Sequence, residues 1–114
     1  MTDSSPLNKP TERVPFDHSV IIYFWYGKET IDELHELSFQ LIDIVEKADV
    51  GVMDGHELNI DNTDGSLYLY GPNAEVLFKT IWPTLQKVDF MKNALVCLQF
   101  GSGEDAPTIE LKLE

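Results

Sequence analysis

His18–Tyr26 reads HSVIIYFWY, and this run of β-branched and aromatic residues decides the fold. Such residues favour extended backbone on a packed, pleated surface, and an uncharged run of this length is typical of a central strand. Ser66–Tyr70, which reads SLYLY, has the same character and predicts a second central strand. The remaining segments must therefore cover at least one face of a sheet built around these two strands.

A helix is predicted after each of these strands. Thr30 and Glu33 match a T-x-x-E capping box, and apolar residues then recur every three or four positions, which indicates one buried helical face. Asn73 is a favourable N-cap for the second helix, which is expected over residues 74–88. Pro83 lies inside that helix and is expected to kink it or split it, because proline removes one backbone hydrogen bond.

The remaining strands are shorter and more polar. Residues 49–61 lead into a strand in which Leu58 and Ile60 alternate with polar residues, and Asp64-Gly65 predicts a tight turn into the next strand. Two further strands are predicted to pair as a C-terminal hairpin, over Leu95–Phe100 and Thr108–Leu113.

The element order β-α-β-β-α-β, followed by one extra strand, predicts an α+β fold of the ferredoxin-like type. Its right-handed crossovers place both helices on one face of an antiparallel sheet, with the first and third strands central. A chain of 114 residues has room for one core, so we expect a single domain over residues 18–114. Residues 1–17 are polar and contain three prolines, so we expect a flexible N-terminal arm there.

Alternation along the two central strands separates aliphatic from aromatic side chains. Successive side chains of a strand point to opposite faces. If the aliphatic sets lie under the helices, Tyr23 and Trp25 share the open face with Tyr68 and Tyr70. Such a face is apolar with polar tips, as are many protein interfaces. The alternative is that the N-terminal arm, the fifth strand or a second copy of the chain covers it for packing alone.

The chain is strongly acidic, with 20 Asp and Glu against 8 Lys and Arg and a formal net charge of −12. Eleven of the acids and only two lysines lie between Lys28 and Asp64. The acids that we expect to contact a partner are Asp32, Glu36, Asp54, Glu57, Asp61 and Asp64. A basic protein is the partner that this charge favours, although acidity also serves solubility without any partner.

Nucleic acids and anionic membranes recruit basic surfaces, so we expect neither as a partner. Aromatic residues on two central strands also resemble RNA-recognition motifs, in which they stack on bases. The basic and glycine residues of that motif are absent here, however, and the only arginine, Arg13, lies in the N-terminal arm.

The sequence contains no pattern that indicates catalysis or metal binding. The carboxylates and His56 between Asp54 and Asp64 fit no calcium loop, and solvated turn and edge residues are the better interpretation. There is no G-x-S-x-G motif or Gly-rich phosphate loop, and Cys97 is expected to be a buried, inert thiol. We therefore expect no catalytic residue, cofactor or metal. Without a leader or a membrane-spanning run, a cytoplasmic location is expected.

Three motifs follow one another between Asp54 and Leu85: D-G-x-E, D-G-x-L-Y-L-Y-G-P-N-A and I-W-P-T-L. This run resembles a set of small acidic bacterial proteins without an assigned activity, which implies a ferredoxin-like fold. In its general character the chain is also similar to immunity proteins of bacterial toxin systems. That likeness implies a non-enzymatic protein with a basic toxin domain as its partner.

The leading hypothesis is therefore a non-enzymatic protein-binding domain, of the kind that neutralises a basic cognate toxin. The open aromatic face would supply apolar contact with that partner, or a homodimer contact, and the acids would meet basic residues. A small-molecule-sensing regulatory domain that acts as a homodimer is the second hypothesis, and an uncharacterised enzyme is the third.

Overall fold

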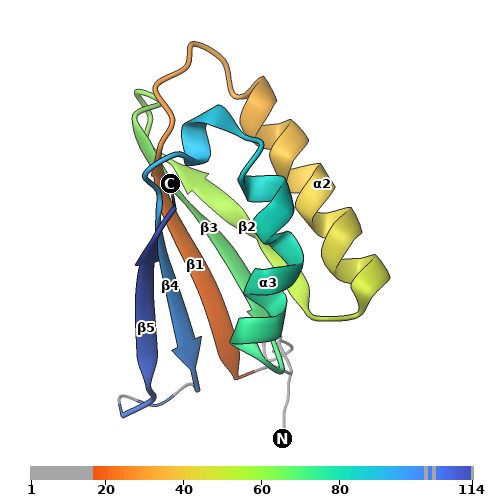
Figure 1. Cartoon of the computed structure of the whole chain (residues 1–114). Helices are drawn as coiled ribbons and strands as arrows, with labels where there is room; N and C mark the ends of the chain where they lie inside the picture. The colour runs from red at the N-terminus through yellow and green to blue at the C-terminus, as the bar shows by residue number, and fades with distance from the viewer. Residues whose placement is uncertain (1–16, 102, 104, 114) are drawn as a thin grey trace, which may run out of the picture.

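The computed structural model describes residues 17–101, 103 and 105–113. It has one five-stranded antiparallel sheet and two α-helices, in an α+β arrangement of the β-α-β-β-α-β type with an added C-terminal strand (Figure 1). In chain order, the elements are β1 (His18–Trp25), α2 (Asp32–Ala48), β2 (Val52–Leu58), β3 (Asp64–Gly71), α3 (Ala74–Leu85), the short 3-10 helix η1 (Asp89–Met91), β4 (Leu95–Phe100) and β5 (Thr108–Lys112).

The sheet order is β2-β3-β1-β4-β5, which confirms the predicted ferredoxin-like order with the fifth strand beside the fourth. β1 is central and pairs antiparallel with β3 on one side and β4 on the other. Both helices lie against the same face of the sheet (Figure 1). The other face carries no packed element in the part of the chain that the structure describes.

The core lies between the sheet and the helices. β1 contributes Val20, Ile22 and Phe24, and β3 contributes Leu67 and Leu69; all five are buried. The helices cover them with apolar stripes at three- and four-residue spacing, formed by Leu34, Leu37, Leu41 and Val45 of α2 and by Leu77, Ile81 and Leu85 of α3. The predicted division of the central strands into an aliphatic core face and an aromatic open face is therefore confirmed.

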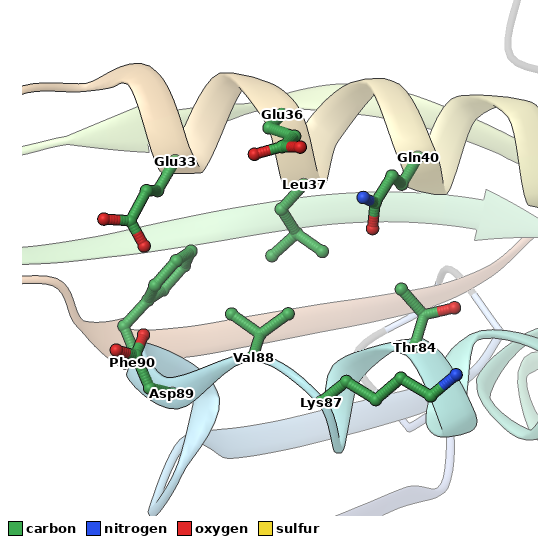
Figure 2. Close-up of a pocket in the computed structure, with 9 residues that line it drawn as sticks. All are labelled: Glu33, Glu36, Leu37, Gln40, Thr84, Lys87, Val88, Asp89 and Phe90. Carbon is green, nitrogen blue, oxygen red and sulfur yellow. The ribbon is translucent and has the colours of Figure 1, made fainter.

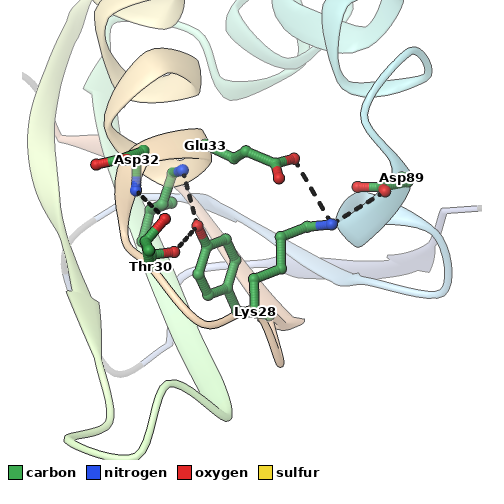
Figure 3. Close-up of polar contacts among 7 residues, drawn as sticks. Lys28, Thr30, Asp32, Glu33 and Asp89 are labelled. Carbon is green, nitrogen blue, oxygen red and sulfur yellow. Dashed lines mark hydrogen bonds and ion pairs between the residues drawn. The ribbon is translucent and has the colours of Figure 1, made fainter.

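Helix α2 begins differently from the prediction. Its N-cap is Ile31, which makes no side-chain cap, and Glu33 turns away toward Lys28 instead of back toward Thr30, so the capping box does not form. Instead, the buried Tyr26 hydroxyl donates to the Thr30 carbonyl and accepts the Leu34 backbone N–H at 3.3 Å (Figure 3). The side chain directly after β1 thus satisfies a donor in the first turn of the helix that would otherwise lack a partner.

Helix α3 begins as predicted. The Asn73 side chain accepts the backbone N–H groups of Glu75 and Val76, at 3.0 and 3.2 Å. The helix ends at Leu85, earlier than expected, and it runs through Pro83 as one element. Because Pro83 lies in the last turn, its missing N–H affects a single helical hydrogen bond near the end.

In the β2–β3 hairpin, β2 is shorter and β3 is longer than predicted. β2 ends at Leu58, so Ile60 lies in the loop and is fully exposed, and the predicted alternation through Ile60 is wrong. The predicted turn at Asp64-Gly65 is also wrong, since both residues belong to β3. The loop instead reverses at Asn62, which adopts the left-handed backbone conformation with φ 61°. β2 also contains a bulge between Met53 and Gly55.

The predicted N-terminal arm, residues 1–17, lies outside the described residues apart from Asp17. Within the described residues, neither helix has the length and apolar character needed to cross a membrane.

The role of Tyr26 leads to a prediction about stability. Changing Tyr26→Phe removes the hydroxyl that serves both Thr30 and Leu34, and we expect it to lower the free energy of unfolding by about 1–2 kcal/mol. The matched control is Tyr23→Phe on the open face, which removes the same hydroxyl from an exposed ring and should change stability by less than about 0.5 kcal/mol. Urea denaturation measures both values, and equal effects would contradict this account.

Candidate binding surface

The open face of the sheet brings most of the predicted aromatic residues together at its centre. Ile21 of β1 lies opposite Tyr68 of β3, and Tyr23 lies opposite Ser66, so Tyr23 and Tyr68 are diagonal neighbours. On the other side of β1, Tyr23 lies opposite Leu95 of β4. Tyr23 and Leu95 are exposed, at 45% and 39%, although both are large apolar side chains. The centre of this face is therefore an apolar surface open to solvent.

The other two predicted aromatics lie toward opposite ends of the same face. Trp25 lies opposite Asp64, and Tyr70 lies opposite Ser19 near the other end of the strand pair. Trp25 is 65% exposed, and its indole lies against Gly27, where a Cβ atom would approach the indole nitrogen to 2.8 Å. Gly27 also has φ 67°, which other residues rarely adopt, so this glycine permits the position of the indole.

Carboxylates border the aromatic centre on the β2 side. Glu57 lies opposite Ser66 on the neighbouring strand, and its Oε1 accepts the Tyr68 hydroxyl at 2.8 Å. That hydrogen bond raises the pKa of Tyr68 above its usual value, because the neutral phenol is the form that can donate. The pKa of Tyr70 is also raised, first by partial burial and then by the charge of Asp54. Glu57 and Asp54 thus adjoin Tyr68 and Tyr70 on the open face.

Asp61 and Asp64 lie on the β2–β3 loop and at the start of β3. The Asp61 carboxylate accepts hydrogen bonds from the Thr63 hydroxyl at 2.6 Å and from the Thr63 backbone N–H at 3.2 Å. These bonds lower the pKa of Asp61. Asp64 accepts the Asn59 side chain at 2.9 Å. Both carboxylates therefore help to shape the loop as well as carrying charge.

The tip of this loop carries an exposed apolar residue, Ile60, that the sequence pattern does not mark as part of a surface. Ile60 projects fully into solvent, and a hollow of about 500 Å³ separates it from Trp25. Acidic residues flank the hollow, among them Glu29 and Asp61. An isoleucine between Asn59 and Asp61 is as typical of a strand as of a loop tip. The exposure of Ile60 therefore becomes clear only from the structure, in which β2 ends at Leu58.

Asp32 and Glu36, the other two predicted acids, lie on α2, in the helix layer on the opposite side of the sheet. Glu36 lines a groove of about 590 Å³ between α2 and the segment from the end of α3 through η1. In Figure 2, Glu33, Glu36 and Gln40 of α2 face Thr84, Val88 and Asp89 across this groove. These acids therefore belong to a second surface and do not join the aromatic face.

Lys28 closes one end of that groove. Its ammonium group lies 3.1 Å from Asp89 Oδ2 and 3.6 Å from Glu33 Oε1 (Figure 3), and 5.9 Å from the centre of the Phe90 ring. The Asp89 hydrogen bond is the main cause that raises the pKa of Lys28, and Glu33 adds to it. One of the few basic residues thus links the β1–α2 loop to α2 and η1 and neutralises part of the groove.

His56 points away from the carboxylates that surround it in the sequence. The bulge in β2 turns His56 toward the helix layer, where its Nδ1 lies 3.2 Å from Ser38 Oγ and its ring centre lies 5.6 Å from that of His35. Burial lowers the pKa of His56, and the proximity of His35 lowers it further. Asp54 and Glu57 therefore do not converge with His56 on a shared ligand.

The described residues contain no group of three His, Cys, Asp or Glu side chains placed to hold a metal ion. Cys97 was expected to be buried, and this prediction is wrong. It lies half-buried on the open face, opposite Ile21 on one side and Glu110 on the other.

Comparison of the sequence with protein-family models and with curated proteins, and of the structure with solved structures, found no match. The function of the chain therefore has to be argued from its own surfaces.

The environment of His56 predicts a loss of stability in mild acid. Because the folded chain lowers the pKa of His56 below its ordinary value of 6.5, the unfolded chain binds the proton more readily. Stability should therefore fall as the pH drops through about 6.5. His56→Gln keeps a hydrogen-bonding side chain without a titrating group, so its urea midpoint should fall less between about pH 7.5 and 5.5. An unchanged pH dependence in the variant would show that His56 is not responsible.

Proposed function

We propose that this chain is a non-enzymatic protein-binding domain whose open sheet face binds a basic partner. The observation that carries the proposal is the continuity of apolar and acidic groups on this face. Tyr23 and Tyr68 form its centre, and Glu57 is hydrogen-bonded to that centre through the Tyr68 hydroxyl. Aromatic anchors surrounded by polar groups are the common arrangement of strong protein contacts.

The chemistry of this face favours arginine and lysine in the partner. An arginine side chain can stack on an exposed ring such as Trp25 while its guanidinium pairs with a carboxylate such as Asp64, which lies opposite Trp25 in the sheet. The net charge of −12 would also attract a basic partner over a longer range and speed encounter. Weaker association at high salt is therefore part of the proposal.

An immunity protein that neutralises a basic toxin is the functional class that we propose. Such a protein needs a stable scaffold and a complementary surface, and it needs no catalytic group. The small size and acidic character that the chain shares with immunity proteins support this class. The continuous aromatic and acidic face is the surface that it would use.

The first experiment identifies the partner and then tests the face. A tagged chain is used to capture proteins from its own cell extract at low and high salt, and the expected result is one basic protein whose recovery falls with salt. With that protein purified, Tyr23→Ser and Trp25→Ser should each weaken binding by at least about tenfold. Phe39→Ser is the matched control, because Phe39 is 70% exposed on α2, and it should bind like the parent chain.

A second set of variants tests the acidic part of the surface. The pair Asp54→Asn and Glu57→Gln removes two charges from the open-face side, whereas the pair Asp32→Asn and Glu36→Gln removes two charges from α2. The proposal expects the first pair to slow association and reduce its salt dependence far more than the second. If the α2 pair has the larger effect, the helix layer is the binding surface. If no partner is recovered at either salt, the proposal fails.

The groove between α2 and α3 favours a second candidate function, the sensing of a small cationic molecule. Its 590 Å³ is in the range of small-molecule sites, and Glu33, Glu36 and Asp89 line it. Thermal unfolding with spermidine as the probe would test this candidate. A rise in the melting temperature that is lost in Glu36→Gln and kept in Glu57→Gln would support it. Equal shifts in the two variants would indicate general charge screening and count against it.

A further inference from the structure

The outer edge of β5 has backbone groups that no described strand satisfies. The Leu113 N–H donates to the Ala94 carbonyl, and the Leu113 carbonyl accepts the Asn93 N–H. The Pro107 carbonyl accepts the Phe100 N–H. The odd-numbered residues of this segment therefore point their backbone groups toward β4. Since backbone groups alternate in direction along an antiparallel strand, those of Thr108, Glu110 and Lys112 point outward. A free row of this kind is a template for another strand.

We propose that two copies of this chain pair through β5, in an antiparallel register with Leu111 on the two-fold axis. In this register Glu110 lies opposite Lys112 of the second copy, and Lys112 lies opposite its Glu110. Both residues point their backbone groups outward, so each of these two pairs exchanges two backbone hydrogen bonds. The resulting contact is isologous, as two-fold symmetry requires.

The charges of β5 select this register over its neighbours. Only registers that place outward-facing residues opposite one another form the ladder. The register centred on Glu110 puts two glutamates opposite each other, and the register centred on Lys112 puts two lysines opposite each other. Opposite charges across a strand pair are favourable and like charges are unfavourable. The register centred on Leu111 therefore has two attractive charge pairs, whereas each of the two neighbouring registers has a repulsive charge pair at its centre.

Apolar side chains on the helix side of β5 fit the same register. Ile109 is 49% exposed there, beyond the cover of the helices. In the proposed pair, Ile109 lies opposite Leu113 of the second copy. Leu113 is buried at the wall of a hollow of about 360 Å³, which Trp82 and Met91 also line. The second copy would thus cover an exposed isoleucine on the helix side of β5.

The overall distribution of charge also favours the β5 edge. The opposite edge of the sheet is β2, where Asp54 and Glu57 would bring like charges together between copies, and where a bulge interrupts the ladder. β5 has one glutamate and one lysine between Thr108 and Lys112, so its net charge is zero. β5 is therefore the edge at which two chains of this acidity repel each other least.

The test measures the mass of the full chain in solution by sedimentation at several concentrations. The parent chain should be a dimer in equilibrium with monomer. Glu110→Lys places lysine opposite lysine in both cross-strand pairs, and Lys112→Glu places glutamate opposite glutamate. Each variant should therefore raise the dimer dissociation constant by at least about tenfold. The two variants change the net charge in opposite directions, so general repulsion cannot produce the same effect in both. The double exchange, Glu110→Lys with Lys112→Glu, restores both pairs and should restore the dimer.

Mixing the two single variants gives an independent result. One variant has two lysines on this edge and the other has two glutamates, so together they should form a mixed dimer although each alone is monomeric. Far-UV circular dichroism and melting temperature confirm that each variant is folded. The proposal is overturned if the parent chain is monomeric up to about 1 mM, a concentration at which even weak specific contacts associate. It is also overturned if both single variants stay dimeric, which would place the dimer contact elsewhere. These readouts require no partner protein, so they are independent of the proposed function.

Discussion

The structure depends on one constraint, the alternation of side chains along β1, the central strand. β1 pairs with β3 and β4, so both of its edges are occupied and it can interact further only through its two faces. One face presents Val20, Ile22 and Phe24 to the helices and is completely buried. Among the described residues, helices cover one side of the sheet, so the other set of side chains must tolerate water yet still favour a strand. Tyrosine and tryptophan meet both requirements, because they favour strands and carry a polar group at the tip.

The same topology distributes charge across the molecule. The order β2-β3-β1-β4-β5 places the acidic β2 segment at one edge and the charge-balanced β5 at the other. The acids of α2 lie in the helix layer, and Lys28 holds two carboxylates together at the end of the helical groove. An acidic stretch that is continuous in the sequence is therefore divided between two surfaces. Only the part on β2 and its loop adjoins the aromatic side chains of the open face, which is why that part carries the functional proposal.

Much of the fold could be predicted from the sequence because periodicity survives in isolated segments. The central strands, the strand order and the cap at Asn73 all follow from local patterns that tertiary contacts reinforce. Two of the failures have a similar cause, which is that a neighbouring residue took the place of the expected signal. The Tyr26 hydroxyl serves the first turn of α2, so Thr30 and Glu33 form no capping box. Asn62 adopts the left-handed conformation, so the hairpin reverses before Asp64-Gly65.

The candidate site was predictable to a similar degree. Alternation was enough to place Tyr23 and Tyr68 on the open face, but it could not show that Glu57 would bond to Tyr68, because that contact depends on the register between β2 and β3. The bulge at Met53–Gly55 shifts that register and sends His56 to the helix side while keeping Glu57 on the open face. Adjacent strand positions point to opposite faces, so His56 and Glu57 are separated, and the extra residue of the bulge takes Asp54 out of register with His56.

The open face and the β5 edge are compatible with one another. Antiparallel pairing of two β5 strands extends the sheet in its own plane, so the two-fold axis is perpendicular to the sheet and both open faces lie on the same side. All four helices would lie on the other side. The aromatic and acidic surfaces of the two copies would then be displayed together, with β4 and β5 of each copy between them. A partner with two basic sites could bind both at once, and the second contact would form at the high effective concentration that the first contact creates. The charge-balanced edge would in this way increase the affinity of the aromatic and acidic face for its partner.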